Sequence, residues 1–278
     1  MVRIVSDTST MYSTTQAKEA GFTVSPLTVT IAGKTYREYD EIDSKTFVSI
    51  IQQGHMPTSS QPAIGAVEEV YRSFPGDQVL NIAMAHGLSG TYQSAVAAAE
   101  LCEGDADVTV INSRTLCGPH RYMVEQAVKM AKENKTLEEI LERVNFLVDS
   151  AKSYLIPADF GYLRRGGRLS PLVAHVGQIA HLAPVMTQTD DGTQLTIASV
   201  RRGFANAFKY VKKALEERGI GEGWRIYITH GDSPSSAELA RKIIGEAFPS
   251  TTIEVLPLSP AFITQGGPGC IAIQVIHD

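Results

Sequence analysis

The first candidates for chemistry are two segments rich in hydroxyl side chains, 57–62 (PTSSQP) and 86–91 (HGLSGT). Consecutive hydroxyls in the first segment can donate hydrogen bonds to a carboxylate or phosphate oxygen. The second segment joins an apolar strand to an alanine-rich helix, and the first turn of a helix has free N–H groups and a partial positive charge. The two segments therefore predict a binding site for an acidic head group.

Both segments also have an ordinary structural interpretation. Ser89 is well placed to cap the helix that follows, a contact that contributes about 1 kcal/mol. Two prolines fix a non-helical path through segment 57–62, which is typical of a solvated turn before a helix. His86 could donate a hydrogen bond or act as a base, and Asp7 could orient hydroxyls or cap a turn. The residues leave these alternatives open.

Arginines gather around a Gly-Gly pair in segment 163–170 (LRRGGRLS). They could hold a phosphate bidentately, present a cationic docking face to an acidic partner, or form an ordinary solvated surface. Arg201 and Arg202 follow a predicted hairpin and could extend the same surface. A glycine-rich segment, 265–270, lies between an irregular apolar loop and the last strand. It could bring backbone close to a ligand or simply turn the chain.

Short β-branched runs alternate with longer helical patterns, which is typical of a parallel sheet covered by helices. The helical patterns include a capping box at Thr136–Glu139. Asp190–Gly192 breaks the alternation because it indicates the turn of a hairpin, so the second half is expected to hold a mixed sheet. The predicted strands are Arg3–Ser6, Thr23–Ile31, Gln78–Ala85, Val108–Ile111, Ser153–Ala158, Arg225–Thr229, Thr252–Leu256 and Ile271–Ile276.

This pattern predicts an α/β fold with two domains. Residues 1–155 are expected to form a three-layer domain with a parallel sheet, which carries the hydroxyl-rich loops. Residues 156–278 are expected to form a two-layer domain with a mixed sheet and the glycine-rich C-terminal loop.

The composition fits a soluble globular protein, with 43% hydrophobic and 20% charged residues among 278. A net charge of −5 disfavours nucleic-acid binding, and no apolar run reaches the roughly 18 residues of a membrane span. Three widely spaced cysteines, Cys102, Cys117 and Cys270, disfavour a disulfide framework, and no Cys or His pair has zinc-ligand spacing. We expect a cytoplasmic protein without a metal and without stable insertion into a membrane.

Several motifs resemble, in order and spacing, those of the DegV family of bacterial fatty-acid-binding proteins. They are Ser6–Ser9, Ser59–Pro62, Leu88–Ala95, Gly166–Ser170 and Gly267–Gly269. The resemblance spans almost the whole chain. It implies a two-domain fold that holds a long-chain fatty acid between or within the domains, with the carboxylate near the hydroxyl loops. It also implies a partner, a separate fatty acid kinase that phosphorylates the bound fatty acid to acyl phosphate. No cofactor is expected besides the bound fatty acid.

The resemblance implies where the carboxylate and the kinase would bind. The expected carboxylate-binding residues are Ser59, Ser60, His86, Ser89, Gly90, Thr91, Gln265 and Gly266. The expected docking residues for the kinase are Arg165, Arg168, Arg201 and Arg202. Gln265 departs from the family pattern, which often has histidine there, and Ala85-His86 stands where the family often has two serines. This chain could thus have a hydrogen-bond donor, His86, in the 86–91 loop, whereas the family often has its histidine in the C-terminal loop.

A fatty acid gains about 0.8 kcal/mol for each methylene removed from water, so an apolar tunnel can supply most of the affinity. The residues expected to line it are Phe160, Leu172, Val176, Ile179, Leu182, Met186, Phe204 and Phe262. The same residues could instead fill an ordinary core.

An enzyme is the alternative, using the same loops for phosphoryl transfer or for hydrolysis by Ser89 or Ser60 with His86. The fold class resembles the substrate domain of dihydroxyacetone kinase. The sequence, however, has no Gly-x-x-x-x-Gly-Lys-Ser/Thr nucleotide loop, no obvious set of Mg²⁺ carboxylates and no Gly-x-Ser-x-Gly elbow. We therefore expect a lipid carrier without catalysis of its own.

Overall fold

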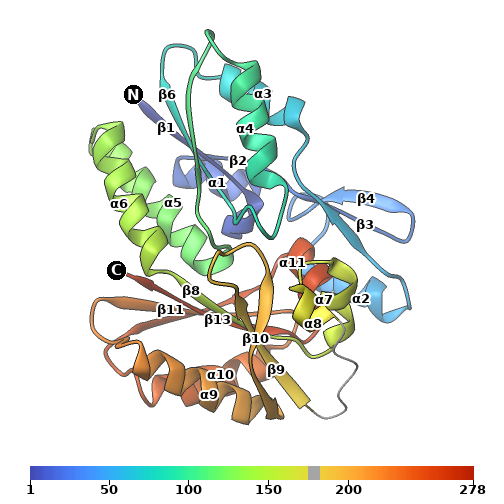
Figure 1. The fold of residues 1–278 in the computed structure, drawn as a ribbon. Helices are drawn as coiled ribbons and strands as arrows, with labels where there is room; N and C mark the ends of the chain where they lie inside the picture. The colour runs from blue at the N-terminus through green and yellow to red at the C-terminus, as the bar shows by residue number, and fades with distance from the viewer. Residues whose placement is uncertain (175–181) are drawn as a thin grey trace. The chain divides into compact units, whose positions relative to one another are not determined.

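The computed structural model describes residues 1–174 and 182–278 (Figure 1). The expected pocket residues Leu172, Val176 and Ile179 lie outside the residues whose side chains are described. The chain divides into two compact units. The N-terminal unit comprises residues 1–43 and 50–149, and the C-terminal unit comprises residues 44–49 and 150–278. The boundary predicted at residue 155 falls inside strand β8 (Lys152–Ile156), which pairs with strands of the C-terminal unit.

A parallel sheet forms the centre of the N-terminal unit. Its strands lie in the order β2 (Thr23–Ser25), β1 (Val2–Asp7), β6 (Gln78–Ala83) and β7 (Asp107–Asn112). All of the neighbouring pairs are parallel, as the alternation of strands and helices predicted. The carboxyl ends of these strands therefore meet at one edge, where ligands of such sheets bind.

Helices cover both faces of this sheet. On one face, Val5 and Val79 pack against helices α3 (Ile64–Arg72) and α4 (Thr91–Leu101). Successive strand residues point to opposite faces, and Ser6 contacts helix α5 (Cys117–Lys132) on the other side. Helices α1 (Thr14–Ala20) and α6 (Leu137–Ser150) also belong to this unit, and the capping box predicted at Thr136 and Glu139 forms at the start of α6. The three-layer arrangement is confirmed.

A second, antiparallel sheet in this unit differs from the prediction. Its order is β4 (Lys34–Arg37), β3 (Thr28–Ile31) and β5 (Thr58–Ser60). The hydroxyl-rich segment interpreted as a turn is thus an edge strand, with Ser59 opposite Val29. The single strand predicted for Thr23–Ile31 is divided between β2 and β3, because Pro26 lacks the N–H that a continuous ladder needs.

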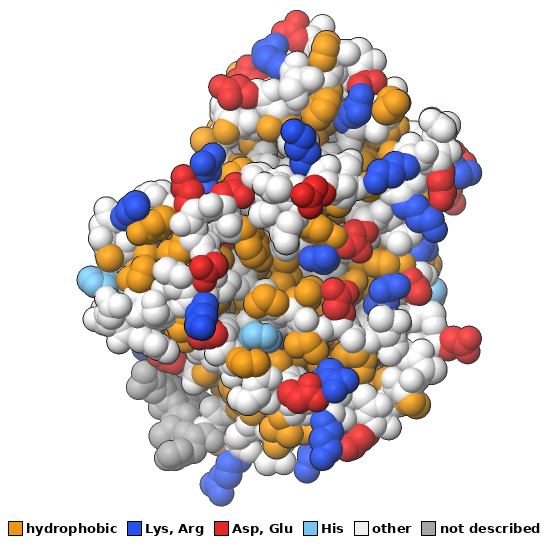
Figure 2. Space-filling view, turned by 180° about the vertical axis from the view of Figure 1, so that it is seen from behind, with side chains coloured by type: hydrophobic (Ala, Val, Ile, Leu, Met, Phe, Trp, Pro, Cys, Tyr) orange, Lys and Arg blue, Asp and Glu red, His pale blue; other side chains and the backbone are white. Residues whose placement is uncertain are grey.

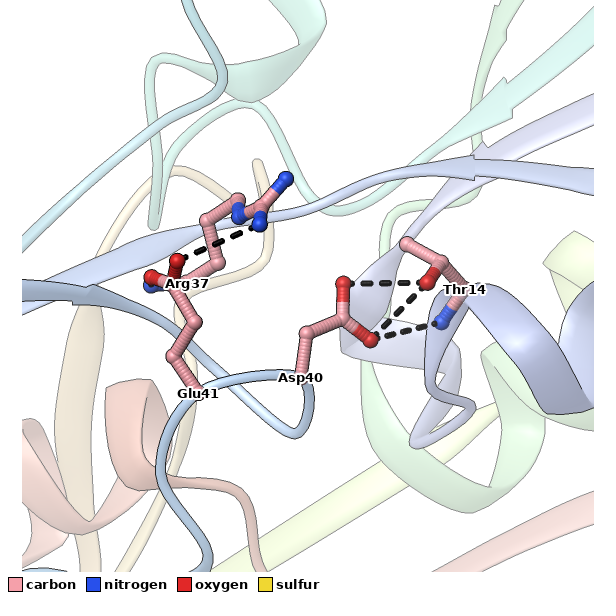
Figure 3. Close-up of polar contacts among 4 residues, drawn as sticks. All are labelled: Thr14, Arg37, Asp40 and Glu41. Atoms are coloured by element: carbon pink, nitrogen blue, oxygen red, sulfur yellow. Dashed lines mark hydrogen bonds and ion pairs between the residues drawn. The ribbon is translucent and has the colours of Figure 1, made fainter.

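The loop after β4 is tied to helix α1 by hydrogen bonds (Figure 3). The Asp40 carboxylate accepts from the Thr14 N–H at 3.2 Å and from the Thr14 hydroxyl at 2.9 Å. This contact adds to the capping box that Ser13 and Gln16 form at the same helix start. The Arg37–Glu41 ion pair, 3.2 Å long, spans the exposed side of the loop.

The C-terminal unit contains the predicted mixed sheet. Its order is β10 (Leu195–Arg202), β9 (Leu182–Gln188), β8, β13 (Ile271–His277), β11 (Trp224–His230) and β12 (Thr252–Pro257). β11 and β12 are parallel, and the other neighbouring pairs are antiparallel. The predicted hairpin at Asp190–Gly192 is confirmed, since it joins β9 to β10.

The two faces of this sheet contact different helices. Helices α9 (Phe204–Glu217) and α10 (Pro234–Gly245) pack against Val185, Ile273 and their neighbours on one face. Met186 points to the opposite face, toward the short helices α7 (Phe160–Gly166) and α8 (Pro171–Ala174).

Helix α2 (Ser44–Gln52) begins at a serine whose hydroxyl donates to the Leu258 carbonyl at 2.5 Å. The apolar loop predicted to be irregular forms a helix, α11 (Pro260–Gly266), whose start is capped by Ser259.

Within the described part of the chain, no helix is long and apolar enough to cross a membrane. Acidic and basic side chains are interspersed over the face seen in Figure 2, so that face has no large patch of one sign. The three cysteines are buried, and no disulfide joins them.

Candidate functional site

The loop between β6 and α4 places hydroxyl groups at the start of a helix. Leu88 and Ser89 donate their N–H groups to the Ala85 carbonyl, which folds the loop into a turn. The Ser89 hydroxyl accepts from the Thr91 N–H at 3.3 Å, and the Ser89 and Thr91 hydroxyl oxygens are 2.8 Å apart. Thr91 is buried and Ser89 is half-buried. The N-cap residue of α4 is Gly90, so Ser89 is not the helix cap that its ordinary interpretation foresaw. Ser89 lies one residue before the cap, accepts from the first N–H of the helix and remains partly accessible.

The two hydroxyl-rich segments adjoin in the N-terminal unit. A Cβ atom built on Gly90 would lie 2.9 Å from Gln61 Nε2 and 3.0 Å from Gln61 Cδ. Gly90 therefore leaves the space that the Gln61 side chain occupies. The spacing of the two segments along the sequence does not predict this contact, which only the fold brings about.

The side chains of Ser59 and Ser60 project from opposite faces of β5, because successive residues of a strand alternate. Ser59 is half-buried and Ser60 is exposed. A head group on one face of β5 can therefore contact only one of the two hydroxyls directly.

His86 is held by Asn112, the last residue of β7. The Asn112 Oδ1 atom accepts from the backbone N–H groups of His86 and Arg114, at 3.2 and 3.0 Å. Asn112 Nδ2 lies 2.7 Å from His86 Nδ1. The His86 ring also makes an edge contact with Tyr92, with 6.2 Å between the ring centroids. His86 thus occupies a fixed, half-buried position in the hydroxyl loop.

Buried polar side chains support the carboxyl end of β1. The Asp7 carboxylate accepts from the backbone N–H groups of Ser9 and Met84, so it caps a short turn and ties β1 to the end of β6. The ring of His120, on α5, lies 2.6 Å from the Ser9 hydroxyl through Nδ1 and 2.9 Å from the Ile82 carbonyl through Nε2. Burial lowers the pKa of His120, and the charge of Asp7 acts in the opposite direction.

A buried glutamate lies beside the same turn. Glu38 Oε1 accepts from the Thr8 hydroxyl at 2.5 Å, and the Thr8 oxygen accepts from the Leu27 N–H at 3.0 Å. Both side chains are fully buried. These contacts fix the turn after β1, and neither residue is exposed to a ligand.

In the C-terminal unit, the Gly-Gly-Arg segment adjoins the glycine-rich C-terminal loop. A Cβ atom on Gly166 would lie 2.1 Å from Gln265 Oε1. Gly267 has a φ of +78°, and a Cβ there would lie 2.7 Å from the ring of Tyr162. Cys270 is buried below the loop, and burial raises the pKa of its thiol to about 12. The predicted residues Gln265 and Gly266 therefore lie in the tightly packed last turn of α11.

Of the four predicted docking arginines, Arg165 lies on α7, Arg168 follows that helix, and the other two lie on β10. Arg165 is exposed and lies over the Tyr162 ring at 4.7 Å, whereas Arg168 is half-buried and donates to the Gly166 carbonyl. Burial lowers the pKa of Arg168. Arg201 and Arg202 are exposed on β10, and Arg201 lies over the Tyr210 ring at 4.8 Å.

Arg168 lies beside the start of β10, whereas Arg201 and Arg202 lie at its end. Backbone hydrogen bonds join Leu195, the first residue of β10, to Arg168 and Ser170 at 2.8 Å. A strand rises about 3.3 Å per residue, so Arg201 lies roughly 20 Å along the strand from this point. A partner would need to span this distance to contact both pairs.

The predicted acyl-chain residues fall into separate groups. Phe160 and Met186 pack together with Leu163 and Leu169 on one face of the mixed sheet. Phe204 packs against the cluster on the opposite face, 5.7 Å from the Phe208 ring. Leu182 is half-buried at the start of β9, and Phe262 is buried in α11. The sheet thus separates Phe204 from Phe160 and Met186.

In the part of the chain that the structure describes, no three His, Cys, Asp or Glu side chains gather as metal ligands would. The hydroxyls of Ser89 and Thr91, the imidazole of His86 and the amides of Asn112 and Gln61 lie in or beside the hydroxyl loop, and such neutral groups suit hydrogen bonding to an anion.

A family model for uncharacterised proteins of the DegV family matches residues 1–278. This chain belongs to the DegV family. A DegV domain-containing protein of Listeria innocua is 28% identical over 277 residues, covering 98% of this chain and 97% of the relative. The relative YteA from Lactococcus lactis is 29% identical over 278 residues, covering 98% and 96%.

Solved DegV structures are similar over the whole length. One describes the fatty acid binding of a DegV family protein from Thermus thermophilus. It has 26% identity and a TM-score of 0.89, covering 100% of this chain and 99% of that one. Another, described as DegV, a fatty acid binding protein from Bacillus subtilis, has 22% identity and a TM-score of 0.87 with the same coverage. At 22% identity the likeness establishes the shared DegV fold.

Two residues beside the hydroxyl loop of this DegV protein were not singled out from the sequence. Asn112 ends an apolar strand, and a polar residue at the carboxyl end of a parallel strand is a usable signal. His120 lies inside the helical pattern after Pro119, where nothing local distinguishes it from an ordinary helix residue. Its role arises from contacts with β1 and β6, which are distant in sequence.

Proposed function

We propose that this protein is a carrier that binds a long-chain fatty acid and presents its carboxylate to a partner kinase. The observation that carries the proposal is the full-length likeness to the DegV protein of Thermus thermophilus, at 26% identity and a TM-score of 0.89, which is described as binding fatty acid. A DegV family structure from Eubacterium eligens, loaded with heptadecanoic acid, has the same fold.

The N-terminal unit would hold the carboxylate with neutral donors. Ser89 lies at the start of α4, where backbone N–H groups add a partial positive charge. Its oxygen accepts from the Thr91 N–H and lies 2.8 Å from the Thr91 hydroxyl oxygen. We propose that Thr91 donates in that pair when the ligand binds, so that the Ser89 O–H donates to a ligand oxygen. Ser59 and His86 are the further half-buried donors that we propose for this end of the ligand.

The C-terminal unit would contact the acyl chain through apolar side chains. Phe160 and Met186 share a cluster with Leu163 and Leu169, and we propose this cluster as an acyl-chain contact. Phe204 is a weaker candidate because it packs on the opposite face of the same sheet. Burial of methylenes here would supply most of the affinity, at about 0.8 kcal/mol each.

We further propose that catalysis belongs to the partner kinase and that both act in the cytoplasm. In the described residues, His86 Nδ1 contacts Asn112 and the Ser89 hydroxyl contacts Thr91, so these two side chains are not paired as a nucleophile and its base. Arg165 is the clearest docking candidate, because it is exposed and its guanidinium is oriented by Tyr162.

Native mass spectrometry of the protein purified from cells tests lipid binding directly. We expect a bound mass within the range of long-chain fatty acids, which denaturation releases. The variant Ser89→Ala should bind fatty acid about 10- to 100-fold more weakly, the effect of losing a donor to a charged group. Ser73→Ala, at an exposed helix end of the same unit, is the matched control. Protein that is empty and hydrolyses acyl esters or ATP alone would contradict the proposal.

Kinase docking is tested by reversing a charge. Arg165→Glu should leave fatty-acid binding unchanged and slow acyl-phosphate formation by the kinase. Arg164→Glu makes the same change one residue away on α7 and should have a smaller effect. Arg168→Glu is less clean, because the Arg168 side chain donates to the Gly166 carbonyl and its loss would disturb the loop. Equal effects of the Arg164 and Arg165 changes would remove Arg165 as a specific docking residue.

A further inference from the structure

Asn112 lies beside the ring of His86 in the N-terminal unit, and the role given to this pair below rests on the proposed function. The orientation of the Asn112 amide is fixed by two backbone groups. The N–H groups of His86 and Arg114 both point at one atom of this amide, at 3.2 and 3.0 Å. Only an oxygen can accept from two N–H donors, so this atom is Oδ1 and the other is the NH₂ group.

The orientation of the amide determines which nitrogen of His86 carries the proton. The Asn112 NH₂ group can only donate, and it lies 2.7 Å from His86 Nδ1. Nδ1 must therefore accept, with its lone pair directed at Asn112. A ring whose Nδ1 accepts is neutral and has its proton on Nε2.

The remaining N–H of His86 is a donor without an acceptor among the described residues. The ring is half-buried, and its other described contact is the edge of Tyr92. The loop that carries it also holds Ser89, three residues further on in the same turn. An oriented neutral donor beside an accessible hydroxyl suits an anionic oxygen, because hydrogen bonds to charged acceptors are the stronger ones.

We propose that Asn112 is a positioning residue that holds His86 as a neutral Nε2–H donor for the carboxylate of the bound lipid. Asn112 acts through His86 and does not contact the ligand itself. The carboxylate is then recognised by neutral donors, Ser89 and His86, and no ion pair in this loop is needed.

Nitrogen-15 NMR of the imidazole rings tests the positioning role without a ligand. We expect His86, assigned by comparison with His86→Gln, to carry its proton on Nε2 in the wild-type protein at neutral pH. Asn112→Asp should move a proton to Nδ1, because a carboxylate oxygen in place of the NH₂ group can only accept. Protonation of Nδ1 in the wild-type protein, or an unchanged spectrum in the Asp variant, would overturn the role of Asn112.

Two substitutions of His86 test the donor. The amide nitrogen of Gln occupies the place of Nε2, and that of Asn occupies the place of Nδ1. We expect His86→Asn to bind stearate about 10- to 100-fold more weakly and His86→Gln to retain most of the affinity. Neither should change the binding of octadecanol, which lacks the carboxylate. Equal loss in both variants, or no loss in His86→Asn, would overturn the proposal.

Binding measurements on the wild-type protein and on the His86 variants separate the carrier function from the role of His86. A wild-type protein that binds neither stearate nor octadecanol would refute the carrier function, while the NMR spectra would still show whether Asn112 sets the His86 proton. A protein that binds stearate equally well with and without the His86 donor would refute only the inference.

Discussion

The loops at the sheet edges are held in different ways in the two units. In the N-terminal unit, buried side chains such as Asp7 and His120 hold the loops by directed hydrogen bonds. In the C-terminal unit, glycines hold the loops by close approach, as Gly267 does against the ring of Tyr162. A hydrogen-bonded loop is sensitive to changes of charge and donor, whereas a closely packed loop is sensitive to added volume.

The largest expected effect is that of Gly267→Ala. Gly267 has φ +78° and ψ 160°, a conformation that is essentially restricted to glycine, and the new methyl group would meet the Tyr162 ring at 2.7 Å. We expect a loss of about 3 kcal/mol or more in the free energy of unfolding. The fluorescence of Trp224, the single tryptophan, reports unfolding of this unit.

Gly192→Ala is the matched control for that change. Gly192 also has a positive φ, +71°, but a Cβ atom there would meet nothing within 4 Å. A loss for Gly192→Ala as large as that for Gly267→Ala would mean that backbone strain alone, and not close packing, explains the effect.

The next effect should come from His120 and depend on pH. Burial lowers the pKa of His120 below its ordinary 6.5, so the unfolded chain binds the proton more tightly than the folded one. The stability that neutral His120 contributes is therefore complete above about pH 6.5 and is lost as the pH falls below it, by at most about 1.4 kcal/mol per pH unit.

Urea unfolding between about pH 8 and about pH 5 measures this dependence. His120→Asn should lower stability at neutral pH by about 1–3 kcal/mol, through lost buried hydrogen bonds, and should flatten the acid slope. The exposed His55→Asn is the control. A slope that is the same in wild type and His120→Asn would show that the N-terminal network is not the acid-sensitive part.

A smaller effect is expected at the loop after β4. Asp40→Ala removes the acceptor of the Thr14 N–H and should cost about 1 kcal/mol, as the loss of a helix cap does. The neighbouring Glu41→Gln affects an exposed ion pair and should leave the urea midpoint unchanged. Equal shifts for both would mean that surface charge, not the directed cap, holds this loop.

The smallest change in stability is expected for Gly90→Ala. Its new methyl group would meet the flexible end of Gln61, and its φ of −74° suits any residue. We expect a loss below about 1 kcal/mol, in contrast to Gly267→Ala, with weaker fatty-acid binding because Gln61 must move. A loss as large as that of Gly267→Ala would show that the N-terminal loops are also held by close packing.

The elements with strong local patterns could be predicted from the sequence. The apolar strand before His86, the capping box at Thr136 and the hairpin turn at Asp190–Gly192 all lie where local chemistry predicts them. The alternation of strands and helices also predicted the parallel sheet, because a parallel pair needs a crossover between its strands.

The way in which residues distant in sequence combine depends on the tertiary structure. Thr58–Ser60 is polar and short, and it is a strand because β3 supplies the hydrogen bonds. Phe204 and Met186 are equally apolar in sequence, and the sheet places them on opposite faces. The proton of His86 depends on Asn112, which lies on the neighbouring strand. A local pattern cannot specify such contacts, because they contribute to the stability of the fold only once the strands have paired.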